Sequence, residues 1–574
     1  MVTGMKGSNR KWGLFRYLVV PAFLLLFFSF TLSPSPFELP NPQDNGFHAN
    51  PTVSFVGEAS ESPVQALIGA IRSATTFSNV SFNDADAKIW RSHNSCAART
   101  ELGPRYARKP HTKPLDPNPQ WDLVLEEYAA LHRTCMRSIG DITEFFRTGT
   151  ATSSCKFLIM ELGGVGLGNK VSLLTSAVLY AVLTQRVILI NTWSLISSTM
   201  CEPFLGSSWL LDQRFPLPGR HGPESTFLGR LTGLEDPVWK SSRYFEKGVD
   251  ATKRGKYVPT PSAMKVEFSD PEVTRFYCDT EQAFLAEATW LHFTGCLYFL
   301  PKLFAVPAFR PALEALFPDP SLTFTYLLRS LMLPRDNVWQ QVKEHDIALF
   351  ANVDTRVGIQ VRFLYGRKVY FERASKRANK HVKQCISENN ILPGAVREDE
   401  RGIGSRTARS GQVIRVFVTS LHTALSEELL RMYDKQETTT GETVMVTQLT
   451  HRGKQGFGSD DDVMAMIEIL LLSFVDKLLI TPLSTFGGLA QAYGAIIPWF
   501  VEMKKNSVSC TRAQTPDLCY QMAYAYYDCP HERNIHRGKI QKTVPYIRQC
   551  LSVEESAGLQ LVPSNLSSKW TSDL

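Results

Sequence analysis

The residues best suited to chemistry lie in a glycine-rich turn, GGVGLGNK, over residues 163–170. The turn follows an apolar run and precedes a stretch with helical spacing, so we expect it to join a strand to a helix. Glycine allows the backbone to approach a ligand closely, and the free N–H groups of a helix N-terminus favour an anion. The Asn169 amide is placed to donate to an oxygen. The alternative interpretation is a tight strand-to-helix turn that binds nothing.

Two familiar glycine motifs do not fit this turn. The dinucleotide fingerprint G-x-G-x-x-G fails because Asn169 stands where the third glycine belongs. The Walker pattern fails because Asn169 separates the last glycine from Lys170, and Val171 replaces the hydroxyl that would bind a metal. We therefore expect neither NAD binding nor ATP hydrolysis.

Further candidate residues stand where predicted strands end. Arg362 lies at the carboxyl end of a strand over residues 357–364, where a diphosphate is the natural bidentate partner and an internal salt bridge is the alternative. The turn PLSTFGG, residues 482–488, places two hydroxyls and two glycines at a helix N-terminus, which suits either phosphate or simple capping. Thr419 and Ser420 end another strand.

The sequence predicts no metal site and no cofactor. Three adjacent acids at residues 460–462 precede a predicted helix, where negative charge caps the N-terminus, with metal binding as the alternative. The scattered cysteines include no C-x-x-C pair, so a zinc site is not expected. A basic stripe from Arg373 to Lys383 is interpreted as a solvated helix face, with substrate contact as the alternative.

The elements that must position these residues alternate between strands and helices. Such alternation favours a doubly wound parallel sheet, in which ligands bind outside the carboxyl ends of the strands. In the first part of the body we expect a β-α-β unit, with strands at 157–160 and 186–191 around a helix at 170–185. In the second part we expect strands at 357–364, 413–420, 444–449, 478–481 and 498–502, and helices at 371–388, 426–436, 463–477 and 489–494.

The chain has 574 residues, more than one hydrophobic core usually supports, so two lobes are expected. A formal charge of +7 is modest and spread out, which implies no nucleic-acid partner but suits an anionic substrate. An uncharged apolar run preceded by basic residues predicts a signal-anchor with a lumenal body, and a cleaved signal peptide is the alternative. The expected organisation is a cytosolic tail 1–16, a transmembrane anchor 17–37, a stem 38–120, an N-terminal Rossmann-like lobe 121–345 and a C-terminal Rossmann-like lobe 346–574 with a cysteine-rich end.

A lumenal body changes the interpretation of the eleven cysteines. In an oxidising compartment, disulfides are the expected state, although the odd number leaves at least one thiol unpaired. Asn79 and Asn565 begin N-x-S sequons and are candidate N-glycosylation sites. The disulfide candidates, with undetermined connectivity, are Cys510, Cys519, Cys529 and Cys550.

With these blocks in view, the chain resembles the plant fucosyltransferases of glycosyltransferase family 37, the xyloglucan α-1,2-fucosyltransferase group. The resemblance is carried, in order, by GLGNKVSLLTSAVLYAVLTQRVILI, MCEPFLGSSWLL, VGIQVRF, VFVTSL, ITPLSTFGGLAQAYGAIIPWF and CTRAQTPDLCYQ. It spans residues 156–529. It implies a GT-B-type fold of two Rossmann-like lobes around a cleft, and a metal-independent, inverting transfer of L-fucose from GDP-fucose to a sugar hydroxyl.

The resemblance also implies roles for individual residues. Arg362 would clamp the GDP β-phosphate, and Asn169 would lie nearest the chemistry. Gly166, Asn169 and Cys296 would lie on the acceptor side. The implied GDP-fucose-binding residues are Gly358, Gln360, Arg362, Thr419, Ser420, Ser484, Thr485, Phe486 and Gly487.

One block departs from the family. In WLHFTGCLYFLP an acid is expected near the middle, and Gly295-Cys296 stands there instead, which puts the acceptor contact and acid/base assistance in doubt. Two interpretations follow: a Golgi type II enzyme that fucosylates galactose of xyloglucan, an arabinogalactan protein or pectin, or a GDP-binding partner subunit with weak or no turnover. A homodimer and a complex with other glycosyltransferases are both left open.

Overall fold

The structure is a computed structural model of the chain. All of the residues that it describes belong to one compact unit within residues 52–574. The predicted anchor at 17–37 and the sequon at Asn79 lie outside the described part, within which no helix combines the length and apolarity needed to cross a bilayer. The described residues are 61–75, 95–107, 115–138, 155–162, 165–191, 198–211, 263–267, 276–362, 368–395, 411–434, 438–450, 456, 458–503, 508–520, 543–551 and 558–565.

The first lobe is built on a four-stranded parallel sheet in the order β2-β1-β4-β3. Its central strand carries the apolar run FLIM, whose side chains are all buried, which is typical of a parallel strand covered on both faces. The next helix, α6, is buried at every residue except Asn169. The elements are β1 Lys156–Leu162, α6 Leu167–Leu183, β2 Arg186–Ile190, β3 Ala263–Glu267 and β4 Trp290–Gly295.

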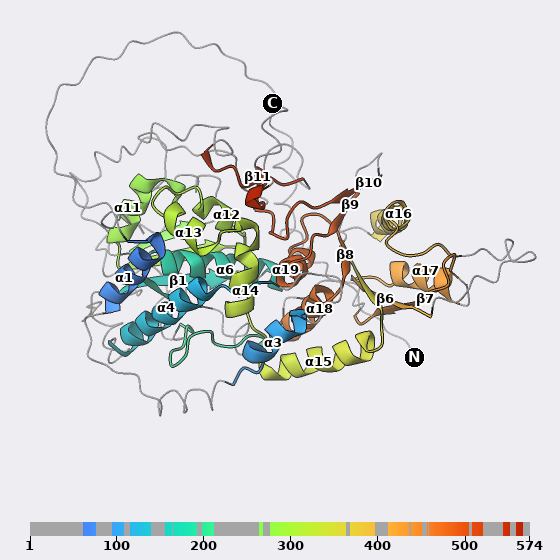
Figure 1. Cartoon of the computed structure of the whole chain (residues 1–574), viewed down its shortest axis with the longest axis horizontal. Helices are drawn as coiled ribbons and strands as arrows, with labels where there is room; N and C mark the ends of the chain where they lie inside the picture. The colour runs from blue at the N-terminus through green and yellow to red at the C-terminus, as the bar shows by residue number, and fades with distance from the viewer. Residues whose placement is uncertain are drawn as a thin grey trace, which may run out of the picture. The chain divides into compact units, whose positions relative to one another are not determined.

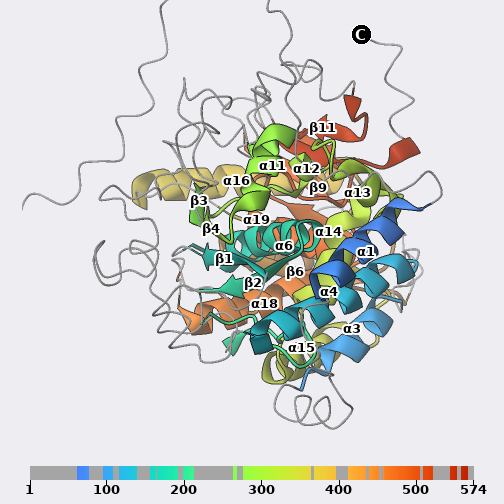
Figure 2. The same ribbon diagram turned by 90° about the vertical axis from the view of Figure 1, so that its left-hand side faces the viewer.

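Further helices cover this sheet and lead toward the second lobe. Figures 1 and 2 both show α1 beside α4, and the two helices contact each other. The helices are α1 Pro63–Thr75, α3 Ala98–Ala107, α4 Pro119–Ser138, α11 Asp279–Glu287, α12 Leu300–Leu303, α13 Arg310–Leu316, the 3-10 helix Pro320–Leu322, α14 Thr323–Leu331 and α15 Asp336–Phe350.

Two of these helices fall within the range for which the sequence predicts a stem. Leu67 and Ile71 of α1 are fully buried, as are Leu102 and Tyr106 of α3. The prediction of an unpacked linker over 38–120 is therefore wrong for these segments. In α3, a Gly-Pro pair interrupts the helical pattern, so tertiary contacts rather than local propensity hold the helix.

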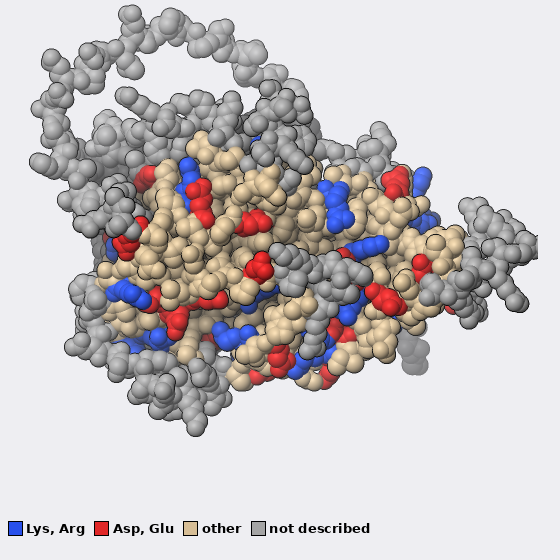
Figure 3. All heavy atoms as spheres, in the orientation of Figure 1, with Lys and Arg blue, Asp and Glu red and all other residues tan. Residues whose placement is uncertain are grey.

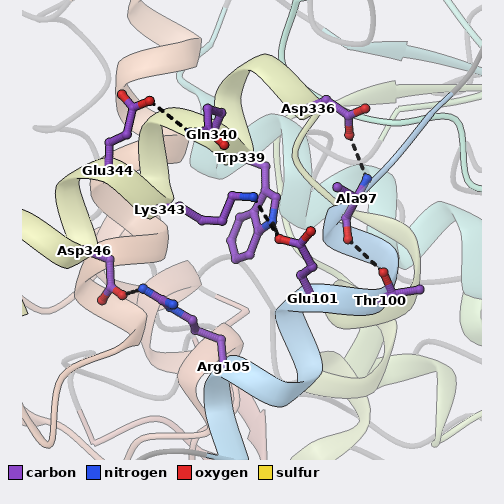
Figure 4. A network of polar contacts seen from close by, with 10 residues as sticks. All are labelled: Ala97, Thr100, Glu101, Arg105, Asp336, Trp339, Gln340, Lys343, Glu344 and Asp346. Carbon is purple, nitrogen blue, oxygen red and sulfur yellow. Dashed lines mark hydrogen bonds and ion pairs between the residues drawn. The ribbon is translucent and has the colours of Figure 1, made fainter.

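Polar contacts fasten α3 to α15 (Figure 4). The Glu101 carboxylate accepts hydrogen bonds from the Trp339 indole at 2.7 Å and from the Lys343 ammonium at 3.0 Å. One turn later, Arg105 forms an ion pair with Asp346. Because α15 leads directly into the second sheet, these contacts tie the N-terminal segment to the connection between the lobes.

The second lobe contains a six-stranded sheet in the order β10-β9-β8-β5-β6-β7. Every pair is parallel except β9 with β10. Numbered along the chain, this is the doubly wound order that places a crevice between the first and fourth strands, here β5 and β8. The strands are β5 Thr355–Val361, β6 Val413–Ser420, β7 Thr443–Gln448, β8 Lys477–Ile480, β9 Trp499–Met503 and β10 Val508–Arg512.

The helices of the second lobe divide between two hydrophobic cores. Buried residues of α18 and α19 share the core of the first lobe, whereas α16 and α17 pack with β5 and β6 in a second core. Consequently α18 and α19 both contact α6, and Figure 1 shows α19 beside it. The helices are α16 Lys368–Glu388, α17 Ala424–Tyr433, α18 Ser459–Ser473 and α19 Thr485–Gly494.

The predicted boundaries of the lobes need two corrections. Residue 345 lies inside α15, so the expected division cuts a helix. The cysteine-rich end returns to the first lobe, where Tyr298 donates to Asp517 at 2.6 Å and Tyr546 donates to Glu314 at 2.7 Å. Such contacts join residues more than 200 positions apart and leave no local sequence signal. The end also contains a hairpin of β11 Ile547–Gln549 and β12 Leu559–Leu561.

Disulfides connect both lobes and the cysteine-rich end. Cys519 and Cys550 are paired, as their clustering indicated. Cys510 bonds instead to Cys385 of α16, and Cys529 lies outside the described residues. Cys296 is a free thiol. Two further disulfides among the described residues are Cys96–Cys201 and Cys135–Cys155.

Charge is mixed on the face drawn in Figure 3, where acidic and basic side chains are interspersed. On α16, Lys376 and Lys380 are exposed and Lys383 pairs with Glu428, as expected for a solvated helix face. A nucleic-acid partner would require a continuous basic region, and the described residues drawn on this face do not form one.

Candidate functional site

A cavity of about 350 Å³ lies where the carboxyl ends of β5 and β6 meet the N-termini of α6, α18 and α19. Segments almost 200 residues apart in the sequence therefore share one wall, with the glycine turn from the first lobe and strand ends from the second. A cavity of this size is typical of small-molecule sites. The predicted site residues that line it are Gly166, Asn169, Gln360, Arg362, Thr419, Ser420, Thr485 and Phe486.

Three buried polar atoms lie on β5, on β6 and at the start of α19, and two of them, on Gln360 and Thr419, belong to residues that line the cavity, whereas the predicted site residue Ser484 does not line it. They are Oε1 of Gln360, Oγ1 of Thr419 and Oγ of Ser484, on side chains from β5, from β6 and from the N-cap of α19. The residues are 4%, 3% and 8% exposed, and these atoms have no hydrogen-bond partner within the part of the chain that the structure describes. An unsatisfied buried polar atom costs about 1–3 kcal/mol. The arrangement therefore favours a polar ligand that supplies the missing partners.

Arg362 follows β5 directly and lines the same cavity. Its backbone N–H donates to Oγ1 of Thr481 at 3.1 Å, and the Thr481 hydroxyl also lies 3.3 Å from the Gln360 carbonyl oxygen. These contacts hold the ends of β5 and β8 together on either side of the crevice. Burial lowers the pKa of the Arg362 guanidinium, but its ordinary value is so high that the group remains cationic at neutral pH.

The glycine turn contacts the N-terminus of α19. The Thr485 hydroxyl donates to Oδ1 of Asn169 at 2.6 Å. A Cβ on Gly168 would lie 2.6 Å from Oγ1 of Thr485 and 2.8 Å from its carbonyl carbon. The structure thus requires glycine at residue 168 because two helices approach there, in addition to any approach by a ligand. Gly163 and Gly164 lie outside the described residues.

Cys296 stands just after β4, beside this turn, and does not line the cavity. Burial raises the pKa of its thiol, and a hydrogen bond with Asn169 opposes that shift. The thiol is therefore protonated at neutral pH, and it cannot act as the carboxylate expected at this position.

The acidic run at the start of α18 has two functions. The Asp461 carboxylate accepts a hydrogen bond from the Gly458 N–H at 3.1 Å, so the predicted capping role is confirmed for this residue. Asp462 instead forms a buried ion pair with Lys170 of α6 at 2.6 Å. Among the described residues, no group of His, Cys, Asp and Glu side chains is arranged to hold a metal ion.

Sequence reasoning missed a carboxylate in the cavity wall. Glu468 of α18 is 6% exposed, and its Oε1 accepts a hydrogen bond from Thr450 at 2.7 Å. The available signal was an acid inside the otherwise apolar run IEILLLS, because a buried carboxylate requires polar partners.

Two predicted glycines lie behind the cavity wall rather than in it. A Cβ on Gly358 would lie 2.9 Å from Leu472, so this residue allows α18 to pack against the sheet. A Cβ on Gly487 would lie 2.6 Å from Oε1 of Gln360. Gly487 therefore makes room for a side chain that does reach the cavity. The second candidate sequon begins at Asn565, which is exposed.

Two Rossmann-like sheets, with a buried polar crevice at the switch point of the second and a glycine turn contributed by the first, define the GT-B class of glycosyltransferases. The sequence pattern of one family within that class, xyloglucan fucosyltransferase, matches residues 91–530. The chain belongs to this family, as its sequence blocks indicated.

Individual relatives support this assignment. The chain is 31% identical over 455 residues to a galactoside 2-alpha-L-fucosyltransferase of Pisum sativum, covering 76% of this chain and 75% of that protein. It is 30% identical over 474 residues to a galactoside 2-alpha-L-fucosyltransferase of Arabidopsis thaliana, covering 80% of each. Among solved structures, a mutant of Arabidopsis thaliana FUT1 in complex with GDP matches with a TM-score of 0.65 and 26% identity, covering 86% of this chain and all of that one.

Proposed function

We propose that this fucosyltransferase transfers L-fucose from GDP-fucose, with inversion, to the 2-hydroxyl of galactose in xyloglucan. The observation that carries the proposal is that Gln360 and Thr419, each with an unpartnered buried polar atom, line the same cavity as Arg362 at the switch point of the second sheet. A diphosphate offers oxygens to the guanidinium and to the N-terminus of α19. The names of the galactoside 2-alpha-L-fucosyltransferase relatives support the acceptor and the linkage.

The cavity suggests an orientation for GDP. With the diphosphate beside Arg362 and the start of α19, the base lies toward α18, where Glu468 and Thr450 line the wall. Guanine presents two neighbouring N–H donors on its Watson–Crick edge, and a carboxylate accepts from both. Adenine has no such pair of donors. Glu468 is therefore proposed as the group that selects guanine.

The reaction breaks the bond between the fucose anomeric carbon and the β-phosphate oxygen and forms a bond to the acceptor oxygen. Negative charge develops on the diphosphate, where Arg362 and the helix N-terminus stabilise its departure. Because the Cys296 thiol is protonated, no strong base is assigned to that position. Departure of GDP is proposed to run ahead of attack, and the acceptor then loses its hydroxyl proton to solvent.

We propose that transfer requires no metal. Charge on the leaving diphosphate is met by Arg362 and by backbone N–H groups. Two of the acids near the cavity have partners within the protein, because Asp461 caps α18 and Asp462 pairs with Lys170.

A lumenal, Golgi-membrane location as a type II protein is also proposed. The disulfides in both lobes suit an oxidising compartment. Arabinogalactan protein and pectin are the alternative acceptors, since all three glycans carry sugar hydroxyls at side-chain ends.

The test is to incubate the purified protein with GDP-fucose and each of the three glycans, and to determine the linkage formed. We expect fucose on the 2-position of xyloglucan galactose and inversion at the anomeric carbon. Transfer to another glycan alone would replace the proposed acceptor. GDP-mannose and UDP-galactose serve as donor controls and are expected to give no product.

Cys296 motivates a second candidate function, a GDP-binding partner subunit without turnover. Its thiol stands where the family resemblance places an acid, so acceptor activation is the step at risk. Binding of GDP without hydrolysis of GDP-fucose or transfer to any acceptor would establish this candidate and reject the enzyme.

A further inference from the structure

A buried ion pair joins the two lobes beside the cavity. Nζ of Lys170, on α6 of the first lobe, lies 2.6 Å from Oδ2 of Asp462, on α18 of the second. The two side chains are 5% and 4% exposed, and Asp462 also lines the cavity. The glycine turn and the acidic run therefore meet in space through the last residue of each motif, a contact that the sequence did not predict.

Neither charge is explained by its own helix. Lys170 lies in the first turn of α6, where the helix dipole disfavours a cation. Asp462 is not needed to cap α18, because Asp461 already accepts the hydrogen bond from the Gly458 N–H. Burying either charge alone is costly, so each requires the other. The pair is best understood as a connection between helices.

Three consecutive residues in the first turn of α6 contact the second lobe. Gly168 lies so close to Thr485 that a Cβ would meet its backbone, and Asn169 accepts a hydrogen bond from its hydroxyl. Lys170 adds the bond to Asp462. The glycine turn is thus fixed against the starts of both α18 and α19, and the second of these helices begins at the proposed phosphate site.

Fixing these helix starts determines the spacing between the two substrates. In the proposed function, α19 holds the leaving diphosphate and the glycine turn belongs to the acceptor side. Transfer between two bound substrates depends steeply on their separation, and a misplacement of about 1 Å costs about a hundredfold in rate. A joint between the lobes therefore affects the rate of transfer more than the affinity for either substrate.

We propose that Lys170 and Asp462 are positioning residues, which hold the acceptor-side turn in register with the donor-side helices during fucosyl transfer. The inference rests on the proposed function for its substrates. It adds that fucosyl transfer requires the ion pair, whereas binding at the donor site alone does not.

The decisive variant is Lys170→Met/Asp462→Leu, which removes both charges. Replacing a buried ion pair by apolar side chains often leaves stability unchanged, whereas removing one partner strands the other charge and is strongly destabilising. The matched control is Arg105→Met/Asp346→Leu, which removes the ion pair between α3 and α15, none of whose residues lines the cavity.

We expect the Lys170/Asp462 double variant to keep the melting temperature of the parent, while kcat for transfer falls about a hundredfold and the GDP Kd changes far less than kcat. Hydrogen exchange of the amides at residues 167–173 is expected to accelerate. The control double variant should keep the parental kcat per folded molecule. The charge-reversed variant Lys170→Asp/Asp462→Lys should recover part of kcat, because it restores a pair.

Parental kcat and exchange in the Lys170/Asp462 double variant would overturn the inference, as would an equal loss of kcat in the control. If the parent binds no GDP and cleaves no GDP-fucose, the proposed function fails. The exchange of residues 167–173 still reports on the joint in that case, and unchanged protection would refute it separately.

Discussion

Replacing Arg362 by Lys separates the shape of this side chain from its charge. Arg362 follows β5, lines the cavity and is fixed through its backbone by Thr481. A guanidinium offers two parallel N–H groups to two phosphate oxygens, whereas an ammonium keeps the charge without that geometry. The variant therefore tests whether bidentate contact to a diphosphate is made at this strand end.

The expected size of the effect follows from the position of the side chain. Removing one preorganised transition-state donor costs about 2.7–4 kcal/mol. Arg362 is only partly buried, so solvent weakens the interaction and the lower end of that range applies. Since each 1.36 kcal/mol is about tenfold in rate, Arg362→Lys should lower kcat/KM for transfer about a hundredfold. Stability should change little, because the side chain faces the cavity.

GDP affinity, transfer and melting temperature are to be measured on one preparation of Arg362→Lys. The site interpretation expects weaker GDP binding and slower transfer at a parental melting temperature. If Arg362 instead forms an internal salt bridge, the variant should have a lower melting temperature and should lose activity only in proportion to the unfolded fraction. Near-parental turnover in a destabilised variant would remove Arg362 from the site.

The other variants test neighbouring parts of the cavity. Gly168→Ala should lower transfer at least about tenfold, because its Cβ meets Thr485. The matched Gly103→Ala in α3 has open space, but Pro104 disfavours helical backbone at a preceding residue with a Cβ, so its stability should change by less than about 1 kcal/mol. Calorimetry and activity assays check both. Glu468→Gln should weaken GDP binding about tenfold and leave weak UDP binding unchanged in titration calorimetry, and equal losses for both would refute guanine selection. Transfer should persist in excess EDTA, and loss that manganese restores would assign a metal to the site.

The second lobe could be predicted from sequence because its elements alternate and its strands are buried. The strand over residues 413–420 has the predicted bounds. The parallel order followed from that alternation, since each crossover needs a helix. The antiparallel edge strand β10 was not predicted, because a short edge strand with one neighbour has only a weak apolar pattern.

Part of the site could likewise be predicted from local sequence patterns, and the rest depends on tertiary contacts. The rule that ligands bind at strand ends predicted that Arg362 and Thr419 share a crevice, and both line one cavity, whereas Ser484, which was predicted with them, does not line it. Lys170 and Asp462 are 292 residues apart in the sequence, and no pattern in either segment indicates that they form an ion pair. A single polar residue within an otherwise apolar helix, such as Glu468, is the other sequence feature that indicates a residue of the cavity.

The hydrogen bond between Thr485 and Asn169 changes the role expected of the Thr485 hydroxyl at the start of α19. Thr485 has one hydroxyl hydrogen, and it is donated to Oδ1 of Asn169. That hydroxyl consequently has no hydrogen left for a phosphate oxygen, although the sequence places it in the donor site. The Asn169 amide group is thereby oriented with its NH2 toward Cys296, where the thiol accepts from it. Under the proposed function, stabilisation of the leaving diphosphate would fall instead to Arg362 and to the backbone N–H groups that open α19. In this arrangement Thr485 couples the donor turn to the acceptor turn, so its replacement by Ser, which keeps the hydroxyl, should be tolerated far better than its replacement by Val.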